Sequence, residues 1–328
     1  MRFVLAGGLA VVVIIAGCGG APPRLPSATP APPTPSSQPG VAASSTPRLP
    51  VDSPATTVAP AAAATLAPIA ASPSAGATGD LASDLVGSGQ LIICSSFPRV
   101  RFAERDANGQ PFGVDVEIGQ AIARRLSMEP DLREVLFESL LDAVAGGSCD
   151  VSIAGQFITA GRLVRIDMIA YRQGSPHVIV QVANPLGIRE LSDLCGRALA
   201  VVSGSVYVEL VRGLGDFAGK GIDDQCRAAG KPVIDLREFP TQKEAEDALA
   251  RGDADAYIGN DFVTVERPQD FALSAPLPPL RNGIGLRKGA SLLNAGVKAA
   301  LGAMIDDGAY LAILEKYGAA DAALSNTD

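Results

Sequence analysis

The residue types best able to do chemistry are sparse in this chain. It contains five cysteines and a single histidine, His177. Zinc sites need cysteine and histidine clustered at short spacings, and no such cluster occurs. A lone histidine beside a predicted strand is usually structural, so we expect no metal ion and no cofactor. Four of the cysteines permit two disulfides in an exported protein, but the sequence alone leaves the pairing open among Cys94, Cys149, Cys195 and Cys226.

The fifth cysteine, Cys18, follows a segment with the pattern of an export signal. Arg2 gives a positive start, residues 3–15 are apolar, and two small residues precede Cys18. The apolar run is shorter than the roughly 20 residues of a membrane-spanning helix, and is typical of a secretory signal. Cys18 after small residues resembles the lipobox of bacterial lipoproteins, in which the cysteine is lipidated and becomes the mature N-terminus. The alternatives are an ordinary signal peptide with a chance cysteine, or an uncleaved anchor.

Residues 1–18 are therefore predicted to be a lipoprotein signal peptide with a lipobox. The protein would be extracytoplasmic, anchored to the outer face of the cytoplasmic membrane by lipid on Cys18. Residues 19–82 are rich in Pro, Ala, Ser and Thr, with almost no charge. Such a segment buries too little apolar surface to offset the entropy of ordering it. We predict a disordered tether.

The remainder, residues 83–322, is long enough for two ordinary domains. The net charge of the chain is −8. A negative charge argues against nucleic acid or an anionic membrane surface as the partner.

Strands and helices alternate through this part of the chain. Short apolar runs predict strands, and apolar residues at helical spacing predict helices. The expected strands are residues 91–93, 151–154, 178–180, 198–202, 233–234 and 256–258. One expected helix begins at Asp115. The other expected helices cover residues 137–144, 188–194, 207–214, 241–250, 292–305 and 310–317, and a capping box at residues 241–244 begins one of them.

This alternation predicts an α/β fold with parallel sheets covered on both faces. Ligands of such folds bind beyond the carboxyl ends of strands. The segments after Ile93, Ile153, Val202 and Ile258 are therefore the candidate site.

Four stretches, in fixed order, are similar to family 3 of the extracellular solute-binding proteins. Residues 113–117, Gly-Val-Asp-Val-Glu, resemble that family's entry into its first helix. Residues 147–162, from Gly-Ser-Cys-Asp-Val to Ile-Thr-Ala-Gly-Arg, resemble its central segment. Residues 252–256, Gly-Asp-Ala-Asp-Ala, and the tail at 306–318 resemble two further motifs.

The resemblance implies a type II, two-lobed periplasmic-binding-protein-like fold, each lobe a mostly parallel sheet flanked by helices. Lobe 1 would comprise residues 84–179 and 282–322, and lobe 2 residues 180–281. It also implies capture of an amino acid or a related carboxylate-bearing solute for an ABC permease, by a monomer without enzymatic activity. The alternatives are a sensory or surface module without a permease, and a cyclohexadienyl-dehydratase-like enzyme on the same fold.

The same resemblance supplies candidate ligand-binding residues. Arg162 stands where the family's arginine clamps a carboxylate, which a guanidinium fork matches with two parallel hydrogen bonds. The alternative is that Arg162 is a surface arginine on a loop and does not contact the ligand. Gly155 would offer a backbone group to the ligand. Ser205 leads into a helix N-terminus, whose free N–H groups favour an anion.

Other positions depart from the family pattern. Phe157 replaces a hydroxyl residue, and either walls the site or turns into the core. Asn260 replaces the acid that meets the ligand's amino group, with Asp261 as a substitute one residue on. A neutral amide cannot form that ion pair, which puts a standard α-amino acid in doubt.

The end of the first strand also departs from the pattern and supplies Ser96, Phe97 and Arg99 as candidates. Phe97 or Phe102 would stack on the ligand, although Phe102 suits the core better. Arg99 and Arg101 at the rim of a cleft would favour a second negative charge on the ligand, or would be solvated loop arginines. Resemblance to some relatives pairs Cys195 with Cys226, which leaves Cys94 and Cys149 unpaired or uncertain.

Overall fold

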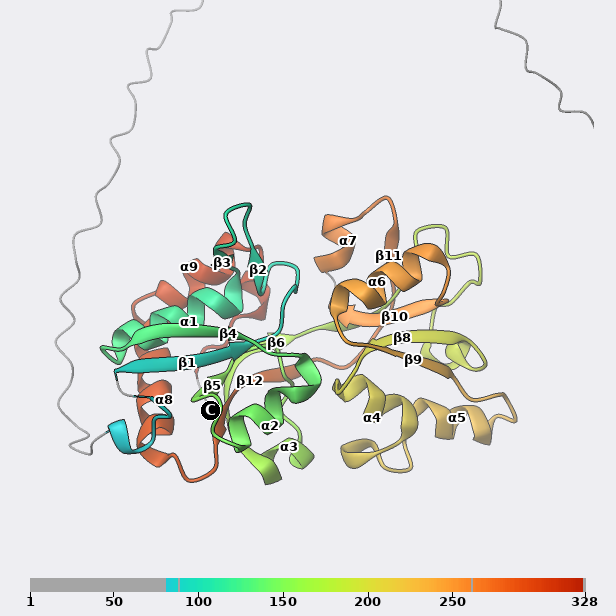
Figure 1. Ribbon diagram of the computed structural model, residues 1–328. Coiled ribbons are helices and arrows are strands. Elements are labelled where there is room, and N and C mark those ends of the chain that lie inside the picture. Colours follow the sequence, from blue (N-terminus) through green and yellow to red (C-terminus); the bar gives the residue numbers. More distant parts are fainter. Residues whose placement is uncertain (1–80, 88, 261, 327–328) are drawn as a thin grey trace, which may run out of the picture. The chain divides into compact units, whose positions relative to one another are not determined.

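The computed structural model describes residues 81–87, 89–260 and 262–326. The predictions for Cys18 and for the signal peptide lie outside these residues, as does the predicted tether as far as residue 80. The described chain folds into two five-stranded sheets, each flanked by helices, and a two-stranded hairpin (Figure 1). The two-lobed α/β architecture expected from the sequence is confirmed.

The first lobe is built on a sheet of strand order β4-β1-β5-β12-β6. Its first three strands run parallel, and β12 is antiparallel to both neighbours. The strands are β1 (Gln90–Ser95), β4 (Glu129–Glu134), β5 (Val151–Ser152), β6 (Ile166–Gly174) and β12 (Leu280–Arg287). The helices are α1 (Val114–Arg125), α2 (Leu140–Ala145), α3 (Ala160–Arg165), α8 (Ser291–Asp306) and α9 (Ala309–Lys316), and the hairpin pairs β2 (Glu104–Arg105) with β3 (Pro111–Phe112).

Strand β1 is buried on both faces, which explains its unbroken apolar run. Leu91 and Ile93 pack in a core with α1, α8 and α9. Ile92 and Cys94 point to the opposite face and pack against α2. Successive side chains of a strand alternate between faces, so a strand covered on both sides needs apolar residues at every position.

The second lobe is built on a sheet of strand order β11-β7-β10-β8-β9. Strands β10, β8 and β9 are parallel, while β7 is antiparallel to β10 and β11. The strands are β7 (Pro176–Gln181), β8 (Ala198–Val202), β9 (Asp235–Phe239), β10 (Ala256–Asn260) and β11 (Phe271–Pro276). The helices are α4 (Val206–Arg212) and α5 (Ile222–Ala228) on one face, α6 (Gln242–Arg251) on the other, and α7 (Phe262–Glu266) after β10 (Figure 1).

Local sequence signals explain several of these elements. The predicted capping box is present, because the Thr241 hydroxyl accepts the Glu244 N–H and the Glu244 carboxylate accepts the Thr241 N–H. The strand expected at residues 233–234 is wrong, because the Ile234 N–H donates to the buried Asp223 carboxylate (2.9 Å) and β9 begins only at Asp235.

The chain passes between the sheets twice. It leaves the first sheet after Gly174, crosses at Ser175 and enters β7 at Pro176. It returns through residues 277–279 into β12. The sheets therefore change a few residues before the lobe boundaries expected at 179/180 and 281/282. The apolar run at 178–180 belongs wholly to the second sheet.

Two disulfides link the described cysteines. Cys195 pairs with Cys226, as the resemblance implied. Cys94 pairs with Cys149, a pairing that the sequence had left open. Cys149 does not lie in strand β5. Its N–H bonds to the Ala143 carbonyl at the end of α2, and this turn sets the residue over the sheet face to which Cys94 points.

Membrane spans and metal-binding clusters are both absent from the described residues. Within them, no helix has the length and apolar character needed to cross a membrane. The same residues contain no group of three or more His, Cys, Asp or Glu arranged to hold a metal ion.

Candidate ligand-binding site

A cavity of about 640 Å³, counted with the solvent at its mouth, lies where strand ends of the two sheets meet. Each of the four segments that the sequence singled out contributes to it: Ser96 follows β1, Gly155 follows β5, Ser205 follows β8 and Asn260 ends β10. The two crossings add Gly174, Ser175, Pro176 and Asn282. The cavity is therefore shared by both lobes and by the connections between them.

Most of the predicted binding residues line this cavity, namely Ser96, Arg99, Gly155, Phe157, Arg162, Ser205 and Asn260. Phe97 is not among the lining residues. Its ring packs with Ala103 and Val116, under the guanidinium of Arg105. Asp261 lies outside the described residues.

Arg162 is held rigidly at the start of α3. The Thr159 hydroxyl caps this helix by accepting the Arg162 N–H (3.2 Å). The Arg162 side chain is buried, and its Nη1 donates to the Phe157 carbonyl (2.9 Å). Its Nη2 reaches across to the second lobe and donates to the Gly204 carbonyl (3.1 Å).

The Arg162 guanidinium has no carboxylate within ion-pair distance among the described residues. Burial lowers the pKa of Arg162 from its ordinary value, because the charged form is desolvated. The charge of Glu209 opposes this lowering, and a buried cation without a direct ion-pair partner is stabilised further by an anion brought beside it.

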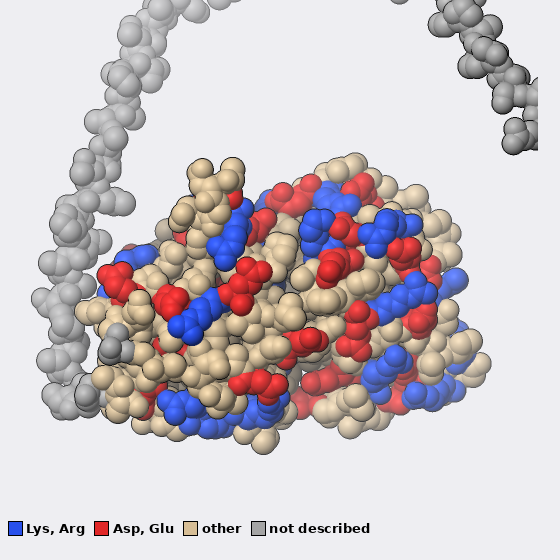
Figure 2. Space-filling view, in the orientation of Figure 1, with Lys and Arg blue, Asp and Glu red and all other residues tan. Residues whose placement is uncertain are grey.

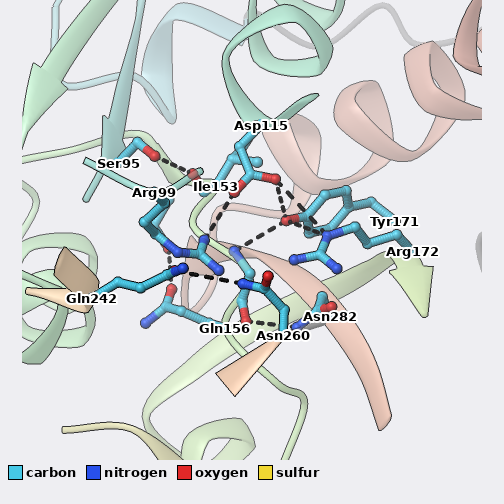
Figure 3. Close-up of polar contacts among 12 residues, drawn as sticks. Ser95, Arg99, Asp115, Ile153, Gln156, Tyr171, Arg172, Gln242, Asn260 and Asn282 are labelled. Carbon is cyan, nitrogen blue, oxygen red and sulfur yellow. Dashed lines mark hydrogen bonds and ion pairs between the residues drawn. The ribbon is translucent and has the colours of Figure 1, made fainter. Parts of the chain in front are cut away.

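A second cationic group lies around Asp115, which is fully buried at the start of α1 (Figure 3). Its carboxylate accepts hydrogen bonds from Arg99 Nη1 (3.1 Å) and from the Tyr171 hydroxyl (2.6 Å). Arg172 Nε lies 4.0 Å from the same carboxylate and 3.4 Å from the Tyr171 oxygen. Two arginines thus share one carboxylate.

Gly155 fits tightly beneath these arginines. Its N–H donates to the Tyr171 hydroxyl (3.0 Å), and its carbonyl accepts from Asn282 Nδ2 (2.6 Å). The backbone group expected to serve the ligand is therefore already engaged. A Cβ at this position would lie 2.5 Å from Arg99 Nη2 and 2.7 Å from Arg172 Nη2, so only glycine leaves room for both guanidinium groups.

Phe157 lines the cavity with an 8% exposed side chain. Its ring meets that of Tyr207 edge to face, with the centroids 6.0 Å apart. Of the two positions that the sequence left open, the ring occupies the wall of the cavity. Because Phe157 belongs to the first lobe and Tyr207 to the second, the pair also joins the lobes.

Polar atoms without partners face the same space. Ser205 Oγ and Asn282 Oδ1 are buried side-chain atoms that find no hydrogen-bond partner among the described residues. Buried polar atoms are usually satisfied, and an unsatisfied pair in a cavity indicates a polar occupant.

Asn260 is tied into a side-chain network of the second lobe. Its Nδ2 donates to Gln242 Oε1 (3.5 Å), and its Oδ1 accepts the Phe262 N–H (3.2 Å). Gln242 Nε2 in turn donates to the buried carboxylate of Glu246 (2.6 Å). Burial raises the pKa of Glu246 to about 7.

The charge of the cavity differs from that of the outer surface. The face shown in Figure 2 carries acidic and basic side chains side by side. Among the described residues that line the cavity, Arg99, Arg162 and Arg172 are charged at neutral pH, and none is Asp or Glu. Arg172 was not predicted from the sequence, although it stands directly after the apolar run at residues 168–171 of β6.

Comparison with known proteins places the chain in a family. The sequence profile described as "Bacterial extracellular solute-binding proteins, family 3" matches residues 91–320. The chain is 29% identical over 141 residues to the arginine-binding extracellular protein ArtP of Bacillus subtilis, a match that covers 43% of the chain and 54% of that protein. The chain thus spans about half the length of ArtP.

Two further similarities extend over most of the folded chain. The L-arginine-binding protein of Pseudomonas aeruginosa is 25% identical over 237 residues, covering 69% of this chain and 86% of that protein. A solved structure, an ancestral arginine-binding protein bound to arginine, matches with a TM-score of 0.62 at 26% identity, covering 70% of this chain and 98% of that one.

Proposed function

The chain belongs to the bacterial extracellular solute-binding proteins of family 3, and we propose that it captures a carboxylate-bearing solute, an amino acid or a related compound, for an ABC importer. The observation that carries this proposal is the buried guanidinium of Arg162, which faces a cavity between the lobes without a carboxylate partner among the described residues. Two parallel N–H groups of an arginine side chain match the two oxygens of a carboxylate, which a single ammonium group cannot do.

The unpartnered Ser205 and Asn282 oxygens support the same proposal. They flank the cavity from different lobes, so a polar solute that satisfies both would also draw the lobes together. The amino group of an amino acid is a suitable donor to such oxygens. Asp261 stays our proposed charged partner for that amino group.

Capture without turnover is the more economical reading of the cavity chemistry. Acid–base or nucleophilic catalysis requires a side chain that can exchange a proton or attack the substrate. The described lining residues include no His, Cys, Lys, Asp or Glu, so the serines and tyrosines of the lining have no such group within it to serve as their base. This composition favours a binding protein over a dehydratase.

The proposal extends to the location of the chain. Lipid on Cys18 would hold the protein at the outer face of the cytoplasmic membrane, and residues 19–82 would let it reach the permease. Such tethering raises the effective concentration of the loaded domain near its partner.

Ligand-dependent thermal stability of the full-length chain tests the proposal. A ligand that binds only the folded state raises the melting temperature. Amino acids, organic acids and polyamines would be screened against the wild type, Arg162→Ala and a control, Arg165→Ala, which alters an exposed arginine of the same helix. We expect stabilisation by a carboxylate-bearing solute in the wild type and the control only. Failure of every compound to stabilise the wild type would contradict solute capture.

A further inference from the structure

We propose that the ligand is a dicarboxylate of four or five carbons, with one carboxylate bound by Arg162 and the other by Arg99 together with Arg172. This inference rests on the proposed function, since it names the substrate class of the same cavity. It departs from the two relatives described above, both of which are arginine-binding proteins.

The guanidinium groups of Arg99 and Arg172 lie close together. Arg99 Nη2 and Arg172 Nη2 lie 2.5 Å and 2.7 Å from one point, the place that a Cβ would take on Gly155. The two guanidinium groups therefore face each other across a few ångström. Like charges at such a separation repel strongly when they are removed from water.

The second step is the charge balance around this pair. Arg172 is buried, and the Arg99 side chain is only 12% exposed. Asp115 is their ion-pair partner among the described residues, and it is fully buried behind them. One carboxylate against two guanidinium groups leaves one positive charge in excess. A ligand carboxylate would cancel this excess and accept charge-assisted hydrogen bonds from both arginines.

The third step is that the pair is fixed before a ligand arrives. Tyr171 donates to Asp115, and Tyr310 donates to the Tyr171 carbonyl (2.7 Å). The guanidinium of Arg172 also lies over the Phe102 ring, 4.1 Å from its centroid. Groups that are already in position lose little entropy on binding, so they contribute more to affinity.

The fourth step is that Arg162 forms a separate positive site in the same cavity. Its guanidinium bonds to the Phe157 carbonyl, two residues along the chain from Gly155. Two residues span at most about 7 Å, so Gly155 and Phe157 are close neighbours. The two positive sites beside them therefore lie near enough for one short dicarboxylate to reach both. Tyr207 is close enough to all three arginines to feel their charge. Burial raises the pKa of Tyr207, and the three positive charges partly offset this rise.

A cationic ligand side chain fits this arrangement poorly. The side chain of arginine would meet Arg99 and Arg172, and the described lining residues offer it no carboxylate. Like charges placed together in a buried site reject the wrong ligand, which is an effective source of specificity. Glutamine is the informative neutral comparison, because it matches glutamate in shape and lacks only the second charge.

The test is calorimetric titration of the full-length chain with L-glutamate, L-aspartate, succinate, 2-oxoglutarate, L-glutamine and L-arginine. We expect at least one dicarboxylate to bind, the matching amide to bind at least about tenfold more weakly, and arginine to give no heat. Glutamine or arginine binding as tightly as the best dicarboxylate would overturn the dicarboxylate inference and leave solute capture standing. No binding by any amino or organic acid would overturn both.

Variants locate the second carboxylate. Arg172→Gln and Arg99→Gln should each abolish most of the preference for a dicarboxylate over its amide, whereas Arg133→Gln, on the exposed part of β4, should retain it. The ratio of the two affinities is the readout, because a variant that is merely destabilised weakens both ligands alike. Arg99→Gln provides the answer if Arg172→Gln fails to fold. Unchanged selectivity in the folded variants would contradict the assignment.

Discussion

At the scale of single residues, the central feature is that Arg162 reaches into the cavity from a capped helix and bridges carbonyls of both lobes. The planar guanidinium can keep both carbonyl bonds and still present N–H groups to a ligand, since it has five donors. An ammonium group has three donors on one atom, so it cannot hold two fixed carbonyls and a carboxylate fork together.

Arg162→Lys is therefore expected to lower ligand affinity by about tenfold or more although the charge is kept. Calorimetric titration measures this loss. Arg165→Lys is the matched control, because Arg165 lies on the same helix and pairs with the exposed Asp142 instead of the cavity. Wild-type affinity in Arg162→Lys would mean that charge alone, without the fork, holds the solute.

Glu246 gives a pH-dependent prediction. Burial raises its pKa from an ordinary value of 4.5 to about 7, so between these values the folded chain keeps a proton that the unfolded chain releases. Stability from this residue is therefore greatest at low pH and falls as the pH rises towards 7, by up to about 3 kcal/mol. Glu246→Gln should remove this dependence, because its amide oxygen can still accept from Gln242.

Thermal melts at pH 5 and pH 8 check this prediction. Glu246→Gln should melt close to the wild type at pH 5 and several degrees above it at pH 8. Glu315→Gln, which alters an exposed glutamate of α9, should follow the wild type at both values. Equal melting of Glu246→Gln and the wild type at pH 8 would show that Glu246 does not bear a buried charge.

Some cavity residues could be predicted from the sequence and others could not, for identifiable reasons. Arg162 and Gly155 stand in a recognisable local motif, so their positions along the chain indicated the site. Arg172 and Asn282 lie on β6 and β12, next to the two crossings between the sheets, and only the three-dimensional path of these strands brings them to the cavity. Phe97 is adjacent to Ser96 in sequence, but its ring points into a small apolar cluster instead.

At the scale of elements, the bounds of some elements are well predicted and the turns between elements are not. Strand β8 has the bounds that its apolar run indicated, and α6 starts at its capping box. The partner of Cys94 depended on how the chain turns after α2, and a non-local position of that kind leaves no trace in the periodicity of the sequence. Because the chain turns back over the sheet after α2, Cys149 lies over the face of the sheet and not within a strand.

Each disulfide is expected to stabilise the lobe that contains it. The bonds close loops with sequence separations of 55 and 31 residues. A disulfide that closes a loop of this size restricts the unfolded chain, and losing the bond typically costs about 2–4 kcal/mol of stability. The double variants Cys94→Ser/Cys149→Ser and Cys195→Ser/Cys226→Ser should each lower the free energy of unfolding measured in denaturant.

The reducing agent provides the control for this prediction. Dithiothreitol should destabilise the wild type further than it does either double variant, and should leave a variant lacking all four cysteines unchanged. A wild type that is indifferent to reduction would contradict a structural role for both bonds.

At the scale of the whole molecule, two mixed sheets meet at their strand ends and enclose a positively charged cavity. The fold class and the two-lobed plan follow from alternating strands and helices together with four family-like motifs. The residues at which the chain crosses from one sheet to the other depend instead on how each strand pairs with its neighbours. β6 and β7 are consecutive strands separated only by Ser175, and an apolar run alone does not reveal which sheet each joins.

Direct contacts between the lobes surround the cavity. Besides Arg162 and Gly204, the Ala160 N–H donates to Asp216 of the second lobe (2.8 Å), and Phe102 meets Phe262 of α7 with their centroids 5.3 Å apart. A solute held by groups of both lobes would add to these contacts, so binding and lobe closure are expected to be coupled.

Identification of the solute that the native protein carries tests the central claim most directly. Protein purified without added ligand would be denatured, the released compound identified by mass spectrometry, and the pure compound titrated into emptied wild type and Arg162→Ala. We predict a small solute with at least one carboxylate that binds the wild type and loses nearly all its affinity in Arg162→Ala. A released compound without a carboxylate, or one that Arg162→Ala binds as tightly as the wild type does, would contradict the account.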